Sequence, residues 1–184
     1  MSEPLAFSPA SKKRIDDLVR RYPRAQAALI PTLYIAQDEF GWLKPPVMQL
    51  VAGTLGVPLT SVLSTAMFYT MLRKKPVGKF HLQICTNVSC YLRGSDALVA
   101  TAQEVLGVHP GETTADGLFT LDEVQCLCDC GHAPALQINR DDHRDVTPDG
   151  LRTLLEDLRA RSSRTTLEQR AAASGPDAEG AAHA

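Results

Sequence analysis

The sequence predicts a mixed fold of the α+β or α/β class, in which a small helical bundle is followed by a compact domain of strands and helices. Apolar residues recur at helical spacing as far as about Leu72, and the period drops to two after residue 76. All five cysteines lie between positions 85 and 130, within the second half. At 184 residues the chain can bury a core without disulfides and can hold one domain or two small ones.

The N-terminal half carries apolar side chains every three or four residues. They are Ile15, Leu18, Val19 and Tyr22, then Leu29, Leu33, Ala36 and Phe40, and then Val47, Leu50, Val51 and Leu55. Pro46 suits the first turn of a helix and Gly56 the position just after one. We therefore expect about three or four short helices over residues 1–75. The run Met67-Phe68-Tyr69 is expected to face the core or a partner protein.

The second half opens with a strand. After the linker 75–78, Phe80, Leu82 and Ile84 alternate with His81 and Gln83, which is typical of a half-buried strand that ends at Cys85. A helix is expected to follow, beginning near Tyr91 or Ser95 and ending at Leu106, before Gly107. The first strand and helix thus start a second domain over residues 76–161.

Two short strands and a last helix complete this domain. The turn Asp116-Gly117 leads into a strand at Leu118–Leu121, and Ala135–Asn139 offers another strand. A helical pattern begins at Pro148 and includes Leu151, Leu154, Leu155 and Leu158. The expected order is β-α-β-β-α. Residues 162–184 show no clear periodicity and are increasingly rich in Ala and Gly, so we expect a disordered tail there.

Charge and composition exclude several classes of function. The formal net charge is −2, and the densest basic run, Arg73, Lys74, Lys75 and Lys79, has no aromatic residues between its members, so nucleic-acid binding is not expected. No apolar run reaches the length of a membrane span, no secretory leader opens the chain, and the cysteine count is odd. We expect a protein of a reducing compartment that does not insert into a membrane.

The cysteines predict a metal site. Cys85 and Cys90 stand in C-T-N-V-S-C, and Cys126, Cys128 and Cys130 stand in C-L-C-D-C. Thiolates are soft ligands that select iron–sulfur clusters, zinc or cuprous copper. The first pair leaves a strand, and the others occupy the loop between two strands, so the two segments can converge at one sheet edge. Two thiolates from each loop would match a [2Fe–2S] cluster.

Alternatives remain open at this point. Four of the five thiolates could hold a structural zinc ion, although the spacing of the first pair is wider than the usual zinc knuckle. Thiol–disulfide chemistry is disfavoured because no C-x-x-C pair is present. His109, His132 and His143 are given no metal role, since cysteines already complete the ligand count. Cys128 is ambiguous, and spacing favours it as the spare thiol beside Cys126 and Cys130.

The cysteine segments resemble those of a known family. The matching runs are C-T-N-V-S-C-Y-L-R-G and G-E-T-T-A-D-G-L-F-T-L-D-E-V-Q-C-L-C-D-C-G-H-A-P-A-L-Q-I-N, and upstream Y-P-R-A-Q-A-A-L-I-P-T-L-Y-I-A-Q-D-E-F-G-W-L, G-V-P and F-Y-T-M. Together they cover roughly Tyr22 to Leu158 and are similar to the thioredoxin-like [2Fe–2S] ferredoxins, in particular the E subunits of NADH:quinone oxidoreductase, respiratory complex I. This chain departs from the family pattern at Cys128, where a small residue such as Gly or Ala is usual.

The resemblance implies a thioredoxin-like second domain and one [2Fe–2S] cluster held by Cys85, Cys90, Cys126 and Cys130. It implies electron transfer as a subunit of an NADH-oxidising oxidoreductase, with NADH and FMN bound by a partner subunit, with further iron–sulfur subunits, and with no complete active site in this chain. The location implied is cytoplasmic, or the cytoplasmic or matrix face of an energy-transducing membrane as part of a peripheral arm. The homologous diaphorase subunit of an NAD-linked formate dehydrogenase or hydrogenase, and a zinc-stabilised interaction module, are the alternatives.

Overall fold

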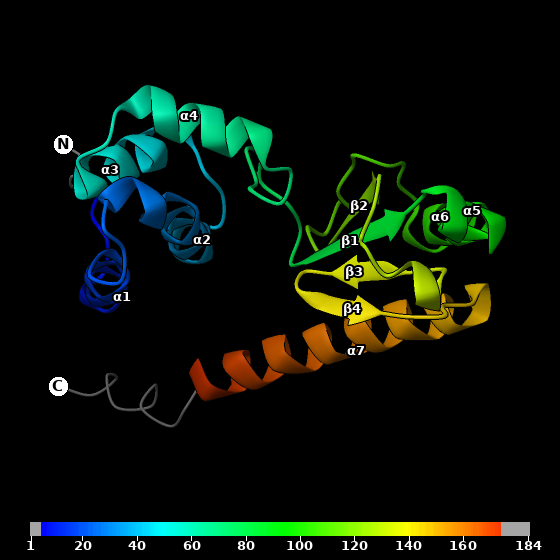
Figure 1. The fold of residues 1–184 in the computed structure, drawn as a ribbon. Coiled ribbons are helices and arrows are strands. Elements are labelled where there is room, and N and C mark those ends of the chain that lie inside the picture. The colour runs from blue at the N-terminus through cyan, green and yellow to red at the C-terminus, as the bar shows by residue number, and fades with distance from the viewer. Residues whose placement is uncertain (1–4, 174–184) are drawn as a thin grey trace, which may run out of the picture. The chain divides into compact units, whose positions relative to one another are not determined.

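The computed structural model describes residues 5–173 and divides the chain into two compact units, Met1–Val77 and Gly78–Ala184 (Figure 1). The division lies beside the expected boundary at residues 75–76. The domain bounds 1–75 and 76–161 stay a prediction. Within the described residues, no helix combines the length and the apolar character that crossing a membrane requires.

The first unit consists of helices. Four α-helices, α1 (Pro9–Val19), α2 (Leu29–Phe40), α3 (Pro45–Leu55) and α4 (Leu59–Phe68), are joined by a short 3-10 helix, η1 (Ala25–Ala28). The α2 helix packs against the other three, around a core that includes Ile15, Leu33, Val47, Val51 and Val62. The predicted helical bundle is therefore confirmed.

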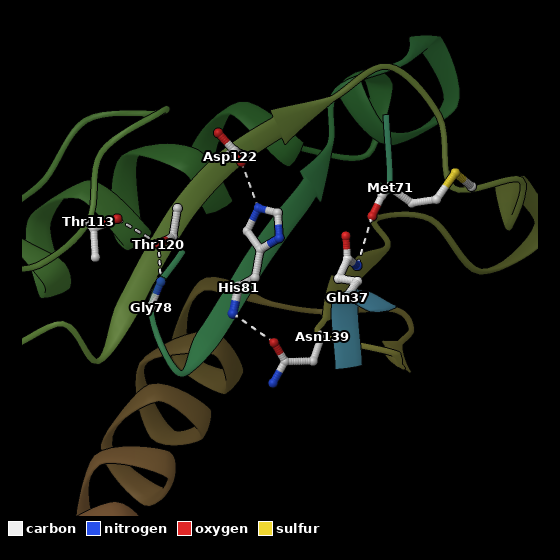
Figure 2. Close-up of polar contacts among 8 residues, drawn as sticks. All are labelled: Gln37, Met71, Gly78, His81, Thr113, Thr120, Asp122 and Asn139. Atoms are coloured by element: carbon white, nitrogen blue, oxygen red, sulfur yellow. Dashed lines mark hydrogen bonds and ion pairs between the residues drawn. The ribbon is translucent and has the colours of Figure 1, made fainter. Parts of the chain in front are cut away.

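Local sequence signals set several ends of these helices, and those at Pro46 and Gly56 were predicted. The side chain of Ser8 caps α1 by accepting a hydrogen bond from the backbone N–H of Ser11 at 3.2 Å. Prolines occupy the first turn of α3, and Gly56 ends that helix in the left-handed region at φ 64°. The buried amide of Gln37 donates to the carbonyl of Met71 at 3.2 Å and so ties the segment after α4 back to α2 (Figure 2).

The second unit is built on a four-stranded sheet with the order β2-β1-β3-β4. Its strands are β1 (Phe80–Cys85), β2 (Phe119–Val124), β3 (Leu136–Ile138) and β4 (Asp141–His143). β1 pairs in parallel with β2, whereas β3 is antiparallel to both β1 and β4. The sequence predicted the first three strands but not β4, whose segment Asp141–His143 lacks the apolar alternation of a half-buried strand.

Helices complete this unit. Along the chain, the short α5 (Val88–Leu92) and the longer α6 (Ser95–Leu106) connect β1 to β2. The 3-10 helix η2 (Cys130–His132) follows β2, and α7 (Pro148–Ala173) comes last. Apolar residues of α6 and α7, including Leu98, Leu151 and Leu155, share one core with Leu82 and Leu121 of the sheet. The predicted α/β domain is confirmed. Gly94, at φ 93°, separates α5 from α6, so both suggested starts, Tyr91 and Ser95, fall in helices.

The end of α7 differs from the expectation of a disordered tail from residue 162. The helix continues to Ala173 because its last part, Ser-Arg-Thr-Thr-Leu-Glu-Gln-Arg-Ala-Ala-Ala, is rich in helix formers and contains neither Gly nor Pro. Residues 174–184 of the predicted tail lie outside the described residues.

His81 also differs from its expected solvent-facing position. Its side chain is buried, with 8% of the residue exposed, and its Nε2 lies 2.6 Å from Oδ2 of Asp122 on the neighbouring strand (Figure 2). The backbone N–H of His81 donates to the side chain of Asn139 at 3.0 Å. On the sheet face opposite Leu82, the carboxylate of Asp122 thus pairs with the buried ring of His81. Period-two alternation alone could not indicate this contact.

Candidate metal centre

Cys85 and Cys90 are placed by regular structure. Cys85 is the last residue of β1 and Cys90 lies in α5, and only 3% and 2% of these residues are exposed. They form a small apolar cluster with Ala133 and Ala135, and the backbone N–H of Cys85 donates to the carbonyl of Ala135 at 3.1 Å. Burial raises the pKa of the Cys90 thiol, and the neighbouring Cys85 and Cys130 raise it further. The first pair is therefore held in an apolar, mostly dry environment.

The other three cysteines lie in the loop between β2 and β3 and are exposed. The Sγ atoms of Cys126 and Cys128 are 3.9 Å apart, and the backbone N–H of Cys128 donates to Cys126 Sγ at 3.2 Å. The proximity of Cys126 is the main reason that the pKa of Cys128 is raised. Cys128 adopts the left-handed conformation at φ 60°, a region that residues with a Cβ atom rarely occupy.

The two cysteine-bearing segments converge. The parallel register pairs Cys85 with Val124, so both strands end side by side, and Cys85 Sγ lies 3.9 Å from the carbonyl oxygen of Gln125. A surface hollow of ≈ 270 Å³ is lined jointly by both segments. Its lining residues are Ser89, Leu92, Arg93, Cys130, Gly131 and Ala133. The expected meeting of the two loops at one sheet edge is thus seen in the structure.

The thiols come from two segments of the chain, an arrangement that a two-iron cluster can use. Among residues 5–173, no three His, Cys, Asp or Glu side chains are gathered closely enough to hold one metal ion. A [2Fe–2S] cluster needs only two protein thiolates at each iron and spans the space between two ligand pairs. One pair comes from β1 and α5 and another from the β2–β3 loop. The donor set therefore fits this group, and the assignment of Cys85, Cys90, Cys126 and Cys130 as its ligands stays a prediction.

A network of ionic contacts holds the second loop. Asp129, between Cys128 and Cys130, accepts from the Nε of Arg144 at 2.5 Å, and its other oxygen lies 2.8 Å from Nδ1 of His132. Contacts with His132 and Arg144 hold the pKa of Asp129 below its usual range. His132, for which the sequence predicts no metal role, contacts Asp129 through Nδ1 of its ring. Nothing in the local sequence pattern pointed to Asp129 or Arg144.

Exposed apolar side chains flank the first cysteine pair. Val88, Tyr91 and Leu92 of α5 are exposed, Leu92 at 78%. In the helical unit, Met67 and Phe68 are exposed at 68% and 75%, whereas Tyr69, the third residue of the run, packs against the core of that unit. Large apolar side chains on a surface are typical of protein–protein contacts.

Comparisons with known proteins identify relatives of this chain. Residues 15–159 match the family model described as thioredoxin-like [2Fe-2S] ferredoxin. The chain is 44% identical over 164 residues to the E 2 subunit of the NADH-quinone oxidoreductase of Rhizobium meliloti (strain 1021), covering 89% of this chain and 98% of that protein. It is 38% identical over 150 residues to the E subunit of the NADH-quinone oxidoreductase of Pseudomonas aeruginosa, covering 82% of this chain and 90% of the relative.

A solved structure is similar in fold. The air-oxidized NAD+-reducing [NiFe]-hydrogenase matches 73% of this chain with a TM-score of 0.62 at 22% sequence identity. This chain spans only 23% of that hydrogenase chain, and the likeness bears on fold alone. The matches confirm the resemblance drawn from the cysteine motif and the expected thioredoxin-like fold class.

Proposed function

Because this chain belongs to the family of thioredoxin-like [2Fe–2S] ferredoxins, we propose that it is an electron-transfer subunit of an NADH:quinone oxidoreductase. It carries one [2Fe–2S] cluster on Cys85, Cys90, Cys126 and Cys130. The observation that carries the proposal is the convergence of two thiol-bearing segments at the ends of β1 and β2. When bound, such a cluster supplies a site that accepts and gives up one electron.

The chain's own residues have three tasks in this function. The buried pair, Cys85 and Cys90, anchors one side of the site and, with Ala133 and Ala135, keeps water away from it. The β2–β3 loop supplies the other thiolates, and the backbone N–H of Cys128 donates to Cys126 Sγ, a contact that favours a negatively charged sulfur. In this function no group of the chain acts as a nucleophile or as a general acid or base.

A partner must supply the electrons. We place NADH and FMN on a partner subunit, with further iron–sulfur subunits beyond it, because the sequence holds no dinucleotide-binding glycine motif after a strand. The exposed Tyr91 and Leu92 beside Cys90 support docking of a protein at this site. In this assembly the chain lies at the cytoplasmic or matrix face of the membrane, in a peripheral arm.

Metal analysis tests the cofactor. Anaerobically purified protein is expected to contain roughly two irons and two acid-labile sulfides per chain, to be silent in electron paramagnetic resonance when oxidised, and to give a spin-half signal after reduction by dithionite. Stoichiometric zinc without sulfide, persisting when iron is supplied, would instead establish the zinc-stabilised module. Co-purifying subunits then distinguish the quinone reductase from a formate dehydrogenase or hydrogenase.

Single substitutions test the ligand assignment. Cys85→Ser and Cys130→Ser are each expected to abolish the cluster, because an iron would lose one of its two protein thiolates. Cys128→Ser is the matched control, since it removes an exposed thiol of the same loop and is expected to keep full iron and sulfide content. Loss of the cluster in the Cys128 variant alone would show that the second pair is wrongly assigned.

A further inference from the structure

The loop that carries Cys126 and Cys130 is attached to the segment before α7 by side chains as well as by backbone. The carbonyl of His132 accepts from the N–H of Asp145 at 2.9 Å, and the carbonyl of Pro134 accepts from the N–H of Val146 at 3.1 Å. These bonds join the part of the loop that follows Cys130. They leave the cysteines themselves to be fixed by other contacts.

Asp129 supplies such contacts, since it stands directly before Cys130 and after Cys128. Its two carboxylate oxygens have different partners, Nε of Arg144 at 2.5 Å and Nδ1 of His132 at 2.8 Å. Its own carbonyl accepts from the backbone N–H of His132 at 3.1 Å. A single residue between two thiols is therefore bonded both to the segment before α7 and to the 3-10 turn η2.

The Asp129 carboxylate is partly shielded from solvent and shared by two partners, unlike the carboxylate of an isolated surface ion pair. The Asp129 side chain is only 22% exposed, although Arg144 and His132 are more open to solvent. An isolated exposed pair contributes little to stability, and several charges in one network with restricted side chains contribute more. The segment before α7 also approaches the first cysteine segment, because Oδ1 of Asp145 lies 4.0 Å from Nη2 of Arg93, just after α5.

We propose that Asp129 is a positioning residue for the cluster, which fixes the backbone of the second ligand loop by clamping it to Arg144 and His132. The inference rests on the proposed [2Fe–2S] site. Groups that orient metal ligands without touching the metal typically change metal affinity by roughly 10–100-fold when they are removed. Without the clamp, the segment 126–130 loses its side-chain bonds to Arg144 and His132, and its thiolates spend more time away from the positions that iron requires.

The test measures how fast a chelator removes iron from the reconstituted holoprotein. Asp129→Ala is expected to release iron at least roughly tenfold faster than the native chain. Arg144→Gln, which removes the partner and leaves the loop sequence intact, is expected to do the same. Asp129→Asn keeps a carbonyl oxygen for the Arg144 N–H and is expected to restore much of the retention. The reduced variants should also show altered g-values, since the sulfur positions change.

A matched control lies elsewhere in the same unit. Nη2 of Arg152 and Oε2 of Glu104 form an ion pair at 2.5 Å, with the same chemical groups, between α7 and the last turn of α6. Glu104→Gln removes that pair and is expected to leave both iron release and the g-values unchanged. A general effect of losing any carboxylate–arginine contact would appear equally in this control.

The outcomes separate the inference from the proposed function. If the native chain assembles no [2Fe–2S] cluster, the proposed function fails. If the native chain binds the cluster and both Asp129→Ala and Arg144→Gln retain iron as long as Glu104→Gln does, with the same g-values, only the clamp is refuted. If Asp129→Ala fails to fold, as judged by circular dichroism, the iron release of Arg144→Gln alone tests the clamp. The Arg144 side chain is 58% exposed and lies outside the loop, so its replacement should not prevent folding.

Discussion

Cys128 offers a test of the backbone geometry of the ligand loop. Its φ of 60° places a residue with a Cβ atom in the left-handed region. Holding such a residue there costs about 1–2 kcal/mol relative to glycine. Replacement by glycine removes that strain, but the greater freedom of glycine in the unfolded chain offsets about 0.4–1 kcal/mol of the gain. We therefore expect Cys128→Gly to raise the free energy of unfolding by about 0.5–1 kcal/mol.

Cys128→Ala is the control that isolates the backbone contribution. It removes the same thiol and its 3.9 Å contact with Cys126 but keeps the Cβ atom, so the glycine variant should exceed the alanine variant by the amount given above. Both variants keep the backbone N–H that bonds Cys126 Sγ. A gain shared equally by both variants would assign the effect to the thiol rather than to the left-handed backbone.

The assay is urea unfolding of the cluster-free chain under reducing conditions. Circular dichroism follows both units, while fluorescence of Trp42, the single tryptophan, follows the helical unit only. The midpoint should rise without a change in the slope of free energy against urea, since the surface exposed on unfolding is nearly the same. A glycine variant that is no more stable than the alanine variant would refute the reasoning from φ.

Three further predictions concern other features of the chain. A Cβ atom at Gly78 would lie 2.8 Å from a backbone carbonyl carbon of β2, so Gly78→Ala should lower the free energy of unfolding by about 1–3 kcal/mol. The control Gly53→Ala, in an open position of α3, should raise this free energy by about 0.5–1 kcal/mol. Urea titrations in which Gly78→Ala is as stable as the native chain would contradict the close packing at Gly78. The pKa of Asp116 is lowered by hydrogen bonds from the Thr114 hydroxyl and a backbone N–H, so the ionised form stabilises the fold above about pH 4 and this stabilisation is lost as pH falls through the lower folded pKa. Asp116→Asn should therefore be less stable than the native chain by less than about 1 kcal/mol at pH 7, with the gap closing in strong acid, and a gap independent of pH in thermal melts would count against the assignment. Leu92 is 78% exposed, and burying it on docking is worth about 1–2 kcal/mol. Leu92→Ala should therefore weaken binding of the proposed flavin-bearing subunit roughly 5–30-fold by calorimetry, and an unchanged Kd would exclude α5 from the interface.

The sequence predicted those parts of the fold that depend on local pattern. Helical spacing and the end signals at Pro46 and Gly56 were sufficient for the bundle, because both act within a few residues of the chain. The tail was misjudged because the interpretation relied on missing apolar periodicity, although residues 162–173 are mostly good helix formers. His81 was misplaced because its burial depends on Asp122, far away in the sequence and adjacent only after β1 and β2 pair.

The same distinction holds for the candidate site. The cysteines could be recognised because their side-chain chemistry is rare and their spacing is characteristic. Asp129 and Arg144 could not, since aspartate and arginine are common surface residues and their contact forms only after the β2–β3 loop folds against the segment before α7. Candidate ligands can therefore be predicted from residue type, whereas the groups proposed to hold them in place can be found only in the tertiary structure.

The unequal burial of the two cysteine segments bears on where electrons would enter and leave the proposed cluster. Cys85 and Cys90 are covered by the sheet end and by Ala133 and Ala135, whereas the β2–β3 loop is open to solvent. A partner that docks over Leu92 and the loop would approach the thiolates with little intervening protein. Because electron transfer depends steeply on distance, this surface should control the transfer rate. The exposed Met67 and Phe68 belong to the helical unit, which contains no cysteine, so substitutions there leave both ligand segments unchanged. Substitutions on α5 should therefore slow electron transfer as well as weaken binding, while those in the helical unit should affect binding alone.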